Sequence, residues 1–326
     1  MTFDGENKIT SAIYRLTSGE EHRAYYTTNH GEQTLTDTLT SALENQNLTL
    51  TGLDMLSDSI PEDCDLLVIN NPVQDFASAG ALVDEMSDLR GYLSRGGKLL
   101  ITTDSYNRTP NLDALLAEYG MTRQEGLVIE NDSNYYLYGT AQTCLLPNLS
   151  SNEITAGVTD GMHVFTPVAQ GIVKGDSTDD LTLTTLLSTS STAYAMQDYA
   201  QASTAEQGKN DPNGPFNIAV AASNSTTGAK VVWVNCANLL NSKGIEYVAR
   251  EYASLLIGGN AQLLTSTMNW MIGEENGVVI DSKSMSAETL TVPAKATMLL
   301  GLLFTIVVPL AFIVAGIAIT LVRRRR

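Results

Sequence analysis

The sequence predicts an α/β domain with a mostly parallel sheet flanked by helices, followed by one membrane-spanning helix at the C-terminus. Two observations support this prediction. Apolar strand-like runs and amphipathic helical segments follow one another over the first hundred residues, in the order strand, helix, strand, strand, helix, strand. At the other end of the chain, the 27 residues from Ala296 to Val322 include no charged side chain.

The C-terminal apolar segment is long enough to cross a lipid bilayer. At ~1.5 Å of rise per residue a helix over 296–322 extends roughly 40 Å, which exceeds the ~30 Å hydrocarbon core of a bilayer. Pro309 interrupts the segment, but membrane helices tolerate proline where local adjustment satisfies the freed carbonyl. The alternative, a buried helix of a soluble core, fits less well because such helices are shorter and carry polar residues.

The charges around the predicted span indicate its orientation. Arg323–Arg326 follow it directly, and such basic clusters stay on the cytoplasmic side. We therefore expect the main domain outside the cytoplasm. Without these four arginines the formal net charge changes from −17 to −21, so nucleic acid and anionic lipid head groups are poor partners for residues 1–295.

The first 31 residues contain no apolar run that resembles a signal peptide. Two arrangements remain open. The chain is the C-terminal part of a longer protein, or it is tail-anchored with its domain in the cytoplasm. We favour the first, because translocating four arginines opposes the positive-inside bias.

The expected organisation has five parts. They are a polar lead over 1–22, the α/β domain over 23–280, a juxtamembrane segment over 281–295, the span over 296–322 and a basic cytoplasmic tail over 323–326.

Hydrophobic periodicity places the elements of the first half of the domain. Strands are expected at 23–28, 48–53, 65–70 and 98–103, and helices at 33–46, 80–94 and 109–119. The run DLLVIN at 65–70 is typical of a strand buried on both faces. In the helix over 80–94, one apolar stripe holds Leu82, Met86, Leu89 and Leu93.

The second half is predicted to contain further strands, a long exposed loop and two helices. Strands are expected at 126–131, 135–139, 166–173, 181–188, 216–222 and 230–236, the loop at 200–215, and helices at 244–257 and 260–272.

Ligands of parallel sheets bind beyond the carboxyl ends of the strands. The candidate ligand- or partner-binding residues at these ends are Asn29, His30, Glu32, Asn70, Asn71, Asp104, Ser105 and Asn107. For His30 two interpretations stay open: its imidazole contacts a ligand, or it bonds to backbone and packs against the following helix.

Catalytic and cofactor motifs are missing from the sequence. Ser105 and Cys236 follow strands, but neither has the flanking glycines of a nucleophile elbow. The sequence contains no P-loop and no dinucleotide-binding glycine motif. Its three cysteines and three histidines are too scattered for a disulfide framework or a metal cluster. We therefore expect no catalytic residues, no cofactor and no metal.

Several stretches resemble one known family. They are residues 3–6, 9–13, 29–32, 60–69, 96–100, 110–112 and 268–271, together with the terminal apolar segment and its arginines. This order is similar to that of the Gld-type (gliding-motility-like) auxiliary components of ABC transport systems. Asn29 stands where the family usually has glycine, and the family also has an N-terminal span.

The resemblance implies a flavodoxin-like or glutamine-amidotransferase-like sheet without a catalytic elbow. It implies a non-enzymatic, membrane-anchored accessory subunit that binds a substrate or partner proteins outside the cytoplasm. The ABC transporter permease and ATPase would be its partners, and the lipid bilayer would hold Ala296 to Val322. The alternative is a hydrolase or amidotransferase-like enzyme with a site at the strand ends.

Overall fold

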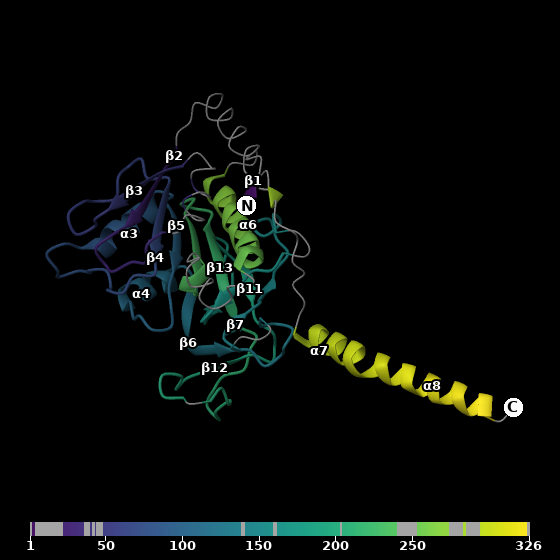
Figure 1. Ribbon diagram of the computed structural model, residues 1–326. Coiled ribbons are helices and arrows are strands. Elements are labelled where there is room, and N and C mark those ends of the chain that lie inside the picture. Colours follow the sequence, from purple (N-terminus) through teal and green to yellow (C-terminus); the bar gives the residue numbers. More distant parts are fainter. Residues whose placement is uncertain are drawn as a thin grey trace.

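The computed structural model describes residues 2–3, 22–35, 40, 43, 48–137, 141–158, 162–202, 204–239, 253–273, 283–284 and 294–324. In these residues, a mixed sheet of eleven strands forms the centre of the domain. Helices cover both faces of this sheet, and an apolar helix projects at the C-terminal end (Figure 1).

The first half of the sheet is parallel, as the sequence predicts. Its strands are β2 (His22–Thr27), β3 (Leu48–Leu53), β4 (Leu66–Asn70), β5 (Lys98–Thr102) and β14 (Lys230–Val234). They pair in the order β3, β2, β4, β5, β14, all parallel. All five residues of β4 are buried, which agrees with the apolar run in its sequence.

The second half of the sheet is antiparallel, so the prediction of a mostly parallel sheet is wrong. Its strands are β6 (Met121–Ile129), β8 (Asn148–Leu149), β10 (Gln170–Lys174), β11 (Leu181–Ser188), β12 (Tyr194–Met196) and β13 (Asn217–Asn224). The path continues from β14 through β13, β10 and β6 to β12, and β11 pairs with β13 and β8. Short connections such as residues 225–229, between β13 and β14, permit only antiparallel neighbours.

Two further strand pairs lie outside the main sheet. β1 (Thr2–Phe3) pairs with β15 (Lys283–Ser284), and β7 (Cys144–Leu145) pairs with β9 (Thr166–Pro167). A short 3-10 helix, η1 (Ala237–Leu239), follows β14.

Helices α3 (Glu85–Ser94) and α4 (Pro110–Glu118) pack on one face of the sheet. The sequence places the start of α3 at residue 80, but the helix begins at Glu85, where Asp84 accepts a hydrogen bond from the Ser87 amide at 3.0 Å. Leu82 therefore lies outside the helix and is fully exposed, whereas Met86, Leu89 and Leu93 are buried as expected.

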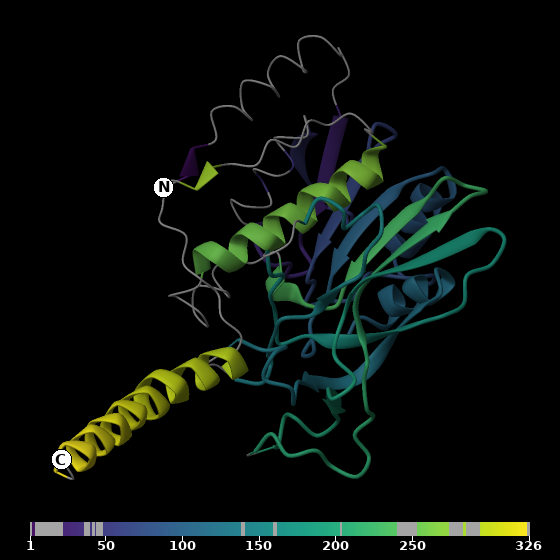
Figure 2. The same ribbon diagram turned by 90° about the vertical axis from the view of Figure 1, so that its right-hand side faces the viewer.

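Helix α6 (Ala253–Ile272) packs on the opposite face. Figure 2 shows it crossing the sheet on the side away from α3 and α4. Its side chains Leu263, Leu264, Met268 and Met271 are buried in the core of that face. The expected helix over 260–272 is thus part of a longer one.

Other differences from the predicted elements are local. The expected strand at 126–131 is the end of the longer β6. In the segment expected to be a strand at 135–139, Tyr136 forms one isolated bridge with Leu145, and residues 138–139 lie outside the described residues. The expected helices at 33–46 and 244–257 also lie mostly outside the described residues. Within the first of them, Thr40 and Leu43 are helical.

The C-terminal helix agrees with the predicted span. It consists of α7 (Ala294–Leu302), a π-helical segment η2 (Leu303–Val307) and α8 (Val308–Arg324). Met298–Ile319 form 22 residues with a mean hydropathy of 2.8, none of them buried, so this helix is long and apolar enough to cross a membrane. The π-helical segment precedes Pro309, which is the kind of local adjustment that a proline within a helix requires.

Close packing under α6 leads to a prediction about Gly259. A Cβ atom at this position would lie 2.1 Å from the His163 carbonyl oxygen, a contact that only a backbone shift can relieve. We expect Gly259→Ala to destabilise the domain by about 1–3 kcal/mol, measured by thermal unfolding of the full chain in detergent.

Gly91 in α3 is the matched control, because its nearest neighbour would be the Arg95 side chain at 3.9 Å. Gly91→Ala should stabilise the domain by about 0.5–1 kcal/mol through helix propensity. Equal effects of the two substitutions would contradict the proposed close approach of α6 to His163.

Candidate functional site

The predicted site residues lie in three loops along the edge of the sheet that the carboxyl ends of its parallel strands form. Residues 29–32 follow β2, residue 70 ends β4 and residue 71 follows it, and residues 104–107 follow β5. Because β2, β4 and β5 are parallel neighbours, their carboxyl ends lie side by side.

His30 lies buried beneath this edge, with 2% of its surface exposed. Its Nε2 atom is 3.1 Å from the Glu85 carboxylate, and its Nδ1 atom is 3.4 Å from Glu32 Oε1. The ring stacks on Phe76 with centroids 4.1 Å apart. Its carbonyl oxygen accepts hydrogen bonds from the amides of Val73 and Gln74. His30 thus contacts Glu32, Glu85 and Phe76 of its own chain, and most of the helix that the packing interpretation names lies outside the described residues.

The two carboxylates keep the buried imidazole charged. Burial alone would lower the pKa of His30, but the hydrogen bonds to Glu32 and Glu85 outweigh it and raise the pKa from 6.5 to about 9. Burial alone would raise the pKa of the Glu32 carboxyl. Hydrogen bonds, chiefly the one with His30, outweigh burial and lower this pKa below its ordinary value. The result is an imidazolium held between two carboxylates.

Three predicted residues of the other two loops, Asn71, Asp104 and Asn107, meet in one polar network. The Asn71 side-chain amide donates to Asp104 Oδ2 at 3.0 Å, and Asp104 Oδ1 accepts from the amides of Tyr106 and Asn107 at 2.8 and 2.7 Å. Asn70 accepts from Thr102 Oγ1 at 2.9 Å and donates to the Gln33 carbonyl at 2.9 Å. These side chains therefore fix the loops to each other.

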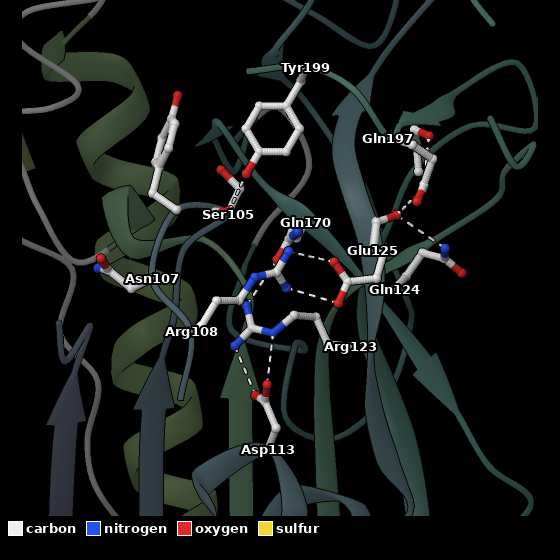
Figure 3. Close-up of polar contacts among 12 residues, drawn as sticks. Ser105, Asn107, Arg108, Asp113, Arg123, Gln124, Glu125, Gln170, Gln197 and Tyr199 are labelled. Carbon is white, nitrogen blue, oxygen red and sulfur yellow. Dashed lines mark hydrogen bonds and ion pairs between the residues drawn. The ribbon is translucent and has the colours of Figure 1, made fainter. Parts of the chain in front are cut away.

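Sequence analysis missed Arg123, which connects this network to the antiparallel half of the sheet. Its side chain is 4% exposed and pairs with Asp113, with Nη2 2.9 Å from Oδ1. Its Nη1 atom donates to the Asp104 carbonyl and to Gln170 Oε1, both at 2.9 Å. Figure 3 shows the guanidinium between Asp113 and Gln170. Its partner Gln170 is 47 positions away, so no local sequence signal could have indicated this role.

Both candidate nucleophiles of the sequence, Ser105 and Cys236, are buried. The Ser105 hydroxyl has no hydrogen-bond partner among the described residues. The Ser105 carbonyl accepts a hydrogen bond from the Tyr199 hydroxyl. The Cys236 thiol is buried and donates to the Pro167 carbonyl at 3.2 Å.

The surface around Ser105 is aromatic and polar. The Tyr106 ring is 65% exposed and meets the Tyr199 ring edge-on, with centroids 5.9 Å apart. Beside them, Arg108 and Glu125 form a bidentate pair at 2.6 and 2.9 Å (Figure 3). Both partners of this pair are more than half exposed.

A cavity of about 1080 Å³ lies between β2, β3 and the segment that follows β2. Of the predicted site residues it contains Asn29 and Glu32. It is lined by Tyr26, Thr27, Thr28, Asn29, Gly31, Glu32, Gln33, Thr34, Leu35, Thr40, Leu48, Thr49 and Leu50. The sequence thus indicated one end of this cavity but not its β3 wall.

Comparisons with known proteins give a likeness of fold. No protein-family model matches the sequence, and no curated protein matches it either. Among solved structures, the mmIFT52 N-terminal domain is 16% identical over 76% of this chain and 96% of its own, with a TM-score of 0.54. This similarity shows a shared α/β fold.

Two more distant structures also match. The cytoplasmic protein STM3548 from Salmonella typhimurium is 11% identical over 76% of this chain and 98% of its own, with a TM-score of 0.42. A ThuA-like protein from Parabacteroides merdae is 11% identical over 85% and 96%, with a TM-score of 0.35.

The charged His30 predicts how stability depends on pH. Because the pKa in the folded state, about 9, lies above the ordinary value of 6.5, the stabilisation is complete below pH 6.5 and is lost as pH rises through 9. We expect the free energy of unfolding to fall by on the order of 3 kcal/mol between pH 6 and pH 10, measured by urea denaturation in detergent. His30→Gln should remove this decline, and His163→Gln should keep it.

The two Arg–carboxylate pairs should differ in their contributions to stability. Arg123→Leu leaves Asp113, Gln170 and the Asp104 carbonyl without their buried partner, so we expect a loss of roughly 3–5 kcal/mol. Arg108→Leu breaks an exposed pair and should cost less than about 1 kcal/mol. Thermal unfolding of both variants checks the difference, and similar losses would contradict it.

Proposed function

We propose that this chain is a membrane-anchored accessory subunit of an ABC transporter. Its α/β domain binds a substrate or partner proteins outside the cytoplasm and performs no chemistry. The observation that carries the proposal is the C-terminal apolar helix, which the described core does not cover and which four arginines follow.

Bilayer physics supports the proposed anchor and its orientation. The 22 residues of Met298–Ile319 extend roughly 33 Å as a helix, close to the thickness of the hydrocarbon core. Apolar side chains that are exposed along an entire helix are stable in lipid and costly in water. The arginines at 323–326 favour a cytoplasmic C-terminus, and we expect the domain on the other side.

The geometry of the strand ends supports binding rather than catalysis. Asn71, Asp104 and Asn107 bond to one another, and His30 is enclosed by Glu32 and Glu85. An enzyme site at this edge would need a nucleophile within reach of a base, and the Ser105 hydroxyl has no such contact in the described part of the chain. The cavity beside Asn29 and Glu32 provides space for a ligand instead.

The transporter assignment extends the resemblance to the Gld-type auxiliary components. In this proposal, the ATPase and the permease are separate chains, and the domain is of the flavodoxin-like or glutamine-amidotransferase-like kind without a catalytic elbow.

Protease accessibility tests the anchor and its orientation. Protease added to intact cells should digest the α/β domain and leave an epitope after Arg326 protected, with a cytoplasmic protein as the lysis control. A protected domain and a digested C-terminal epitope would overturn the proposed topology.

Purification tests the transporter assignment. The detergent-solubilised chain should retain an ATP-binding cassette protein and a polytopic permease, and a version with only the apolar segment and its arginines should not. Turnover of amide or ester substrates that Ser105→Ala or Cys236→Ala abolishes would instead indicate a hydrolase or amidotransferase-like enzyme.

A further inference from the structure

Strand β3 forms the end of the main sheet, and its outer edge is unpaired among the described residues (Figure 1). Exposed edges present backbone donors and acceptors to any extended chain, and proteins usually protect them with charges, prolines or bulges. The six residues of β3, LTLTGL, contain no charged residue and no proline, and their pairing with β2 is regular over the full length.

One backbone hydrogen bond shows which groups of β3 point outward. The Leu53 carbonyl accepts from the Thr28 amide at 2.9 Å, so Leu53 directs its backbone groups toward β2. These directions alternate along a strand. Thr49 and Thr51 therefore also face β2, whereas the amides and carbonyls of Leu50 and Gly52 face away from the sheet.

The cavity lies beside this edge. Leu48, Thr49 and Leu50 form its β3 wall, and the lining also includes Tyr26 on β2 and Thr28 directly after it. A strand that pairs with the outer edge would bring alternate side chains to the same face as the cavity. The cavity thus adds space for side chains to the backbone recognition that the edge offers.

Charge indicates the chemistry of the partner. Residues 48–65 contain five carboxylates and no lysine or arginine. Asp63 pairs with Arg23 at 2.6 Å and Asp65 with His22 at 3.2 Å. The other three carboxylates, on Asp54, Asp58 and Glu62, make no ion pair with the described residues and lie on the loop that continues from β3. An electropositive strand would complement this surface.

We infer that β3 is a docking edge for an extended, lysine- or arginine-bearing segment of a partner protein, which adds to the sheet beside the cavity. The inference rests on the proposed binding function and specifies its surface. The partner's backbone bonds to Leu50 and Gly52, and its basic side chains lie near Asp54 and Asp58.

Two synthetic probes test the inference on the full chain in detergent. One peptide of about eight residues alternates lysine with valine, and the other alternates glutamate with valine. The lysine peptide should bind and slow hydrogen exchange at the amides of Leu50 and Gly52, and the glutamate peptide should bind roughly tenfold more weakly or not at all. Fluorescence anisotropy measures the affinities.

Two substitutions at one position separate the backbone from the side chain. Leu50→Pro removes the outward amide, which edge strands tolerate, and should weaken binding of the lysine peptide roughly tenfold. Leu50→Ala keeps the amide but removes part of the cavity wall, and should weaken binding less than Leu50→Pro does. Melting temperatures of both variants show whether they fold, and the exchange measurement on the unmodified chain does not depend on either.

Several results would overturn the inference: no binding of the lysine peptide, equal binding of the two peptides, or no protection at Leu50 and Gly52. Dimers of the chain that Leu50→Pro dissociates would assign the edge to a second copy instead. If the chain still co-purifies with an ATPase and a permease in any of these cases, the proposed function stands and only the docking edge is rejected.

Discussion

The parallel pairing of β4, β5 and β14 is the constraint on which the rest of the domain depends. These strands lie in the middle of the sheet with nearly every residue buried, so the sheet must be covered on both faces. It separates two hydrophobic cores, one under α3 and α4 and the other under α6. Trp233 illustrates the consequence, since it is fully buried and its indole nitrogen donates to Thr103 Oγ1 at 2.8 Å.

Burial at the centre also determines what happens at the strand ends. Polar groups that leave a buried sheet need partners within the protein, and the loops after β2, β4 and β5 provide them for one another. The His30 imidazolium joins the first loop to α3 through Glu85. Arg123 joins the third loop to β6 and α4. The strand ends, where such sheets usually bind ligands, are therefore largely occupied by contacts within the chain. The cavity lies instead beside β3, the outermost strand.

Local patterns in the sequence predicted the parts of the fold that depend on local physics. The apolar run of β4, the proline at the start of α4 and the length of the C-terminal apolar helix were all confirmed. The strand order was only half predictable. The pairing of β6 with β10 joins segments about 50 residues apart, and neither strand carries a signal for its partner or direction.

The candidate site was predictable to a similar degree. Its residues were predicted because parallel strands end at one edge, and Asn71, Asp104 and Asn107 do meet there. That these side chains bond to one another depends on their burial. The alternation of apolar and polar residues in a sequence does not show which polar side chains are buried. Glu85 and Arg123 were missed because they come from a helix and a strand whose positions only tertiary packing determines.

The π-helical turn at Leu303–Val307 has a consequence for any helix that packs along this segment. Such a turn accommodates one extra residue, and one residue corresponds to about 100° of rotation around a helix axis. Side chains that align before the turn are out of phase with those that follow it. A straight neighbouring helix would therefore touch one stripe of side chains on α7 and a differently oriented stripe on α8. A single helical period fitted to both α7 and α8 would assign the contact to the wrong residues on one of them.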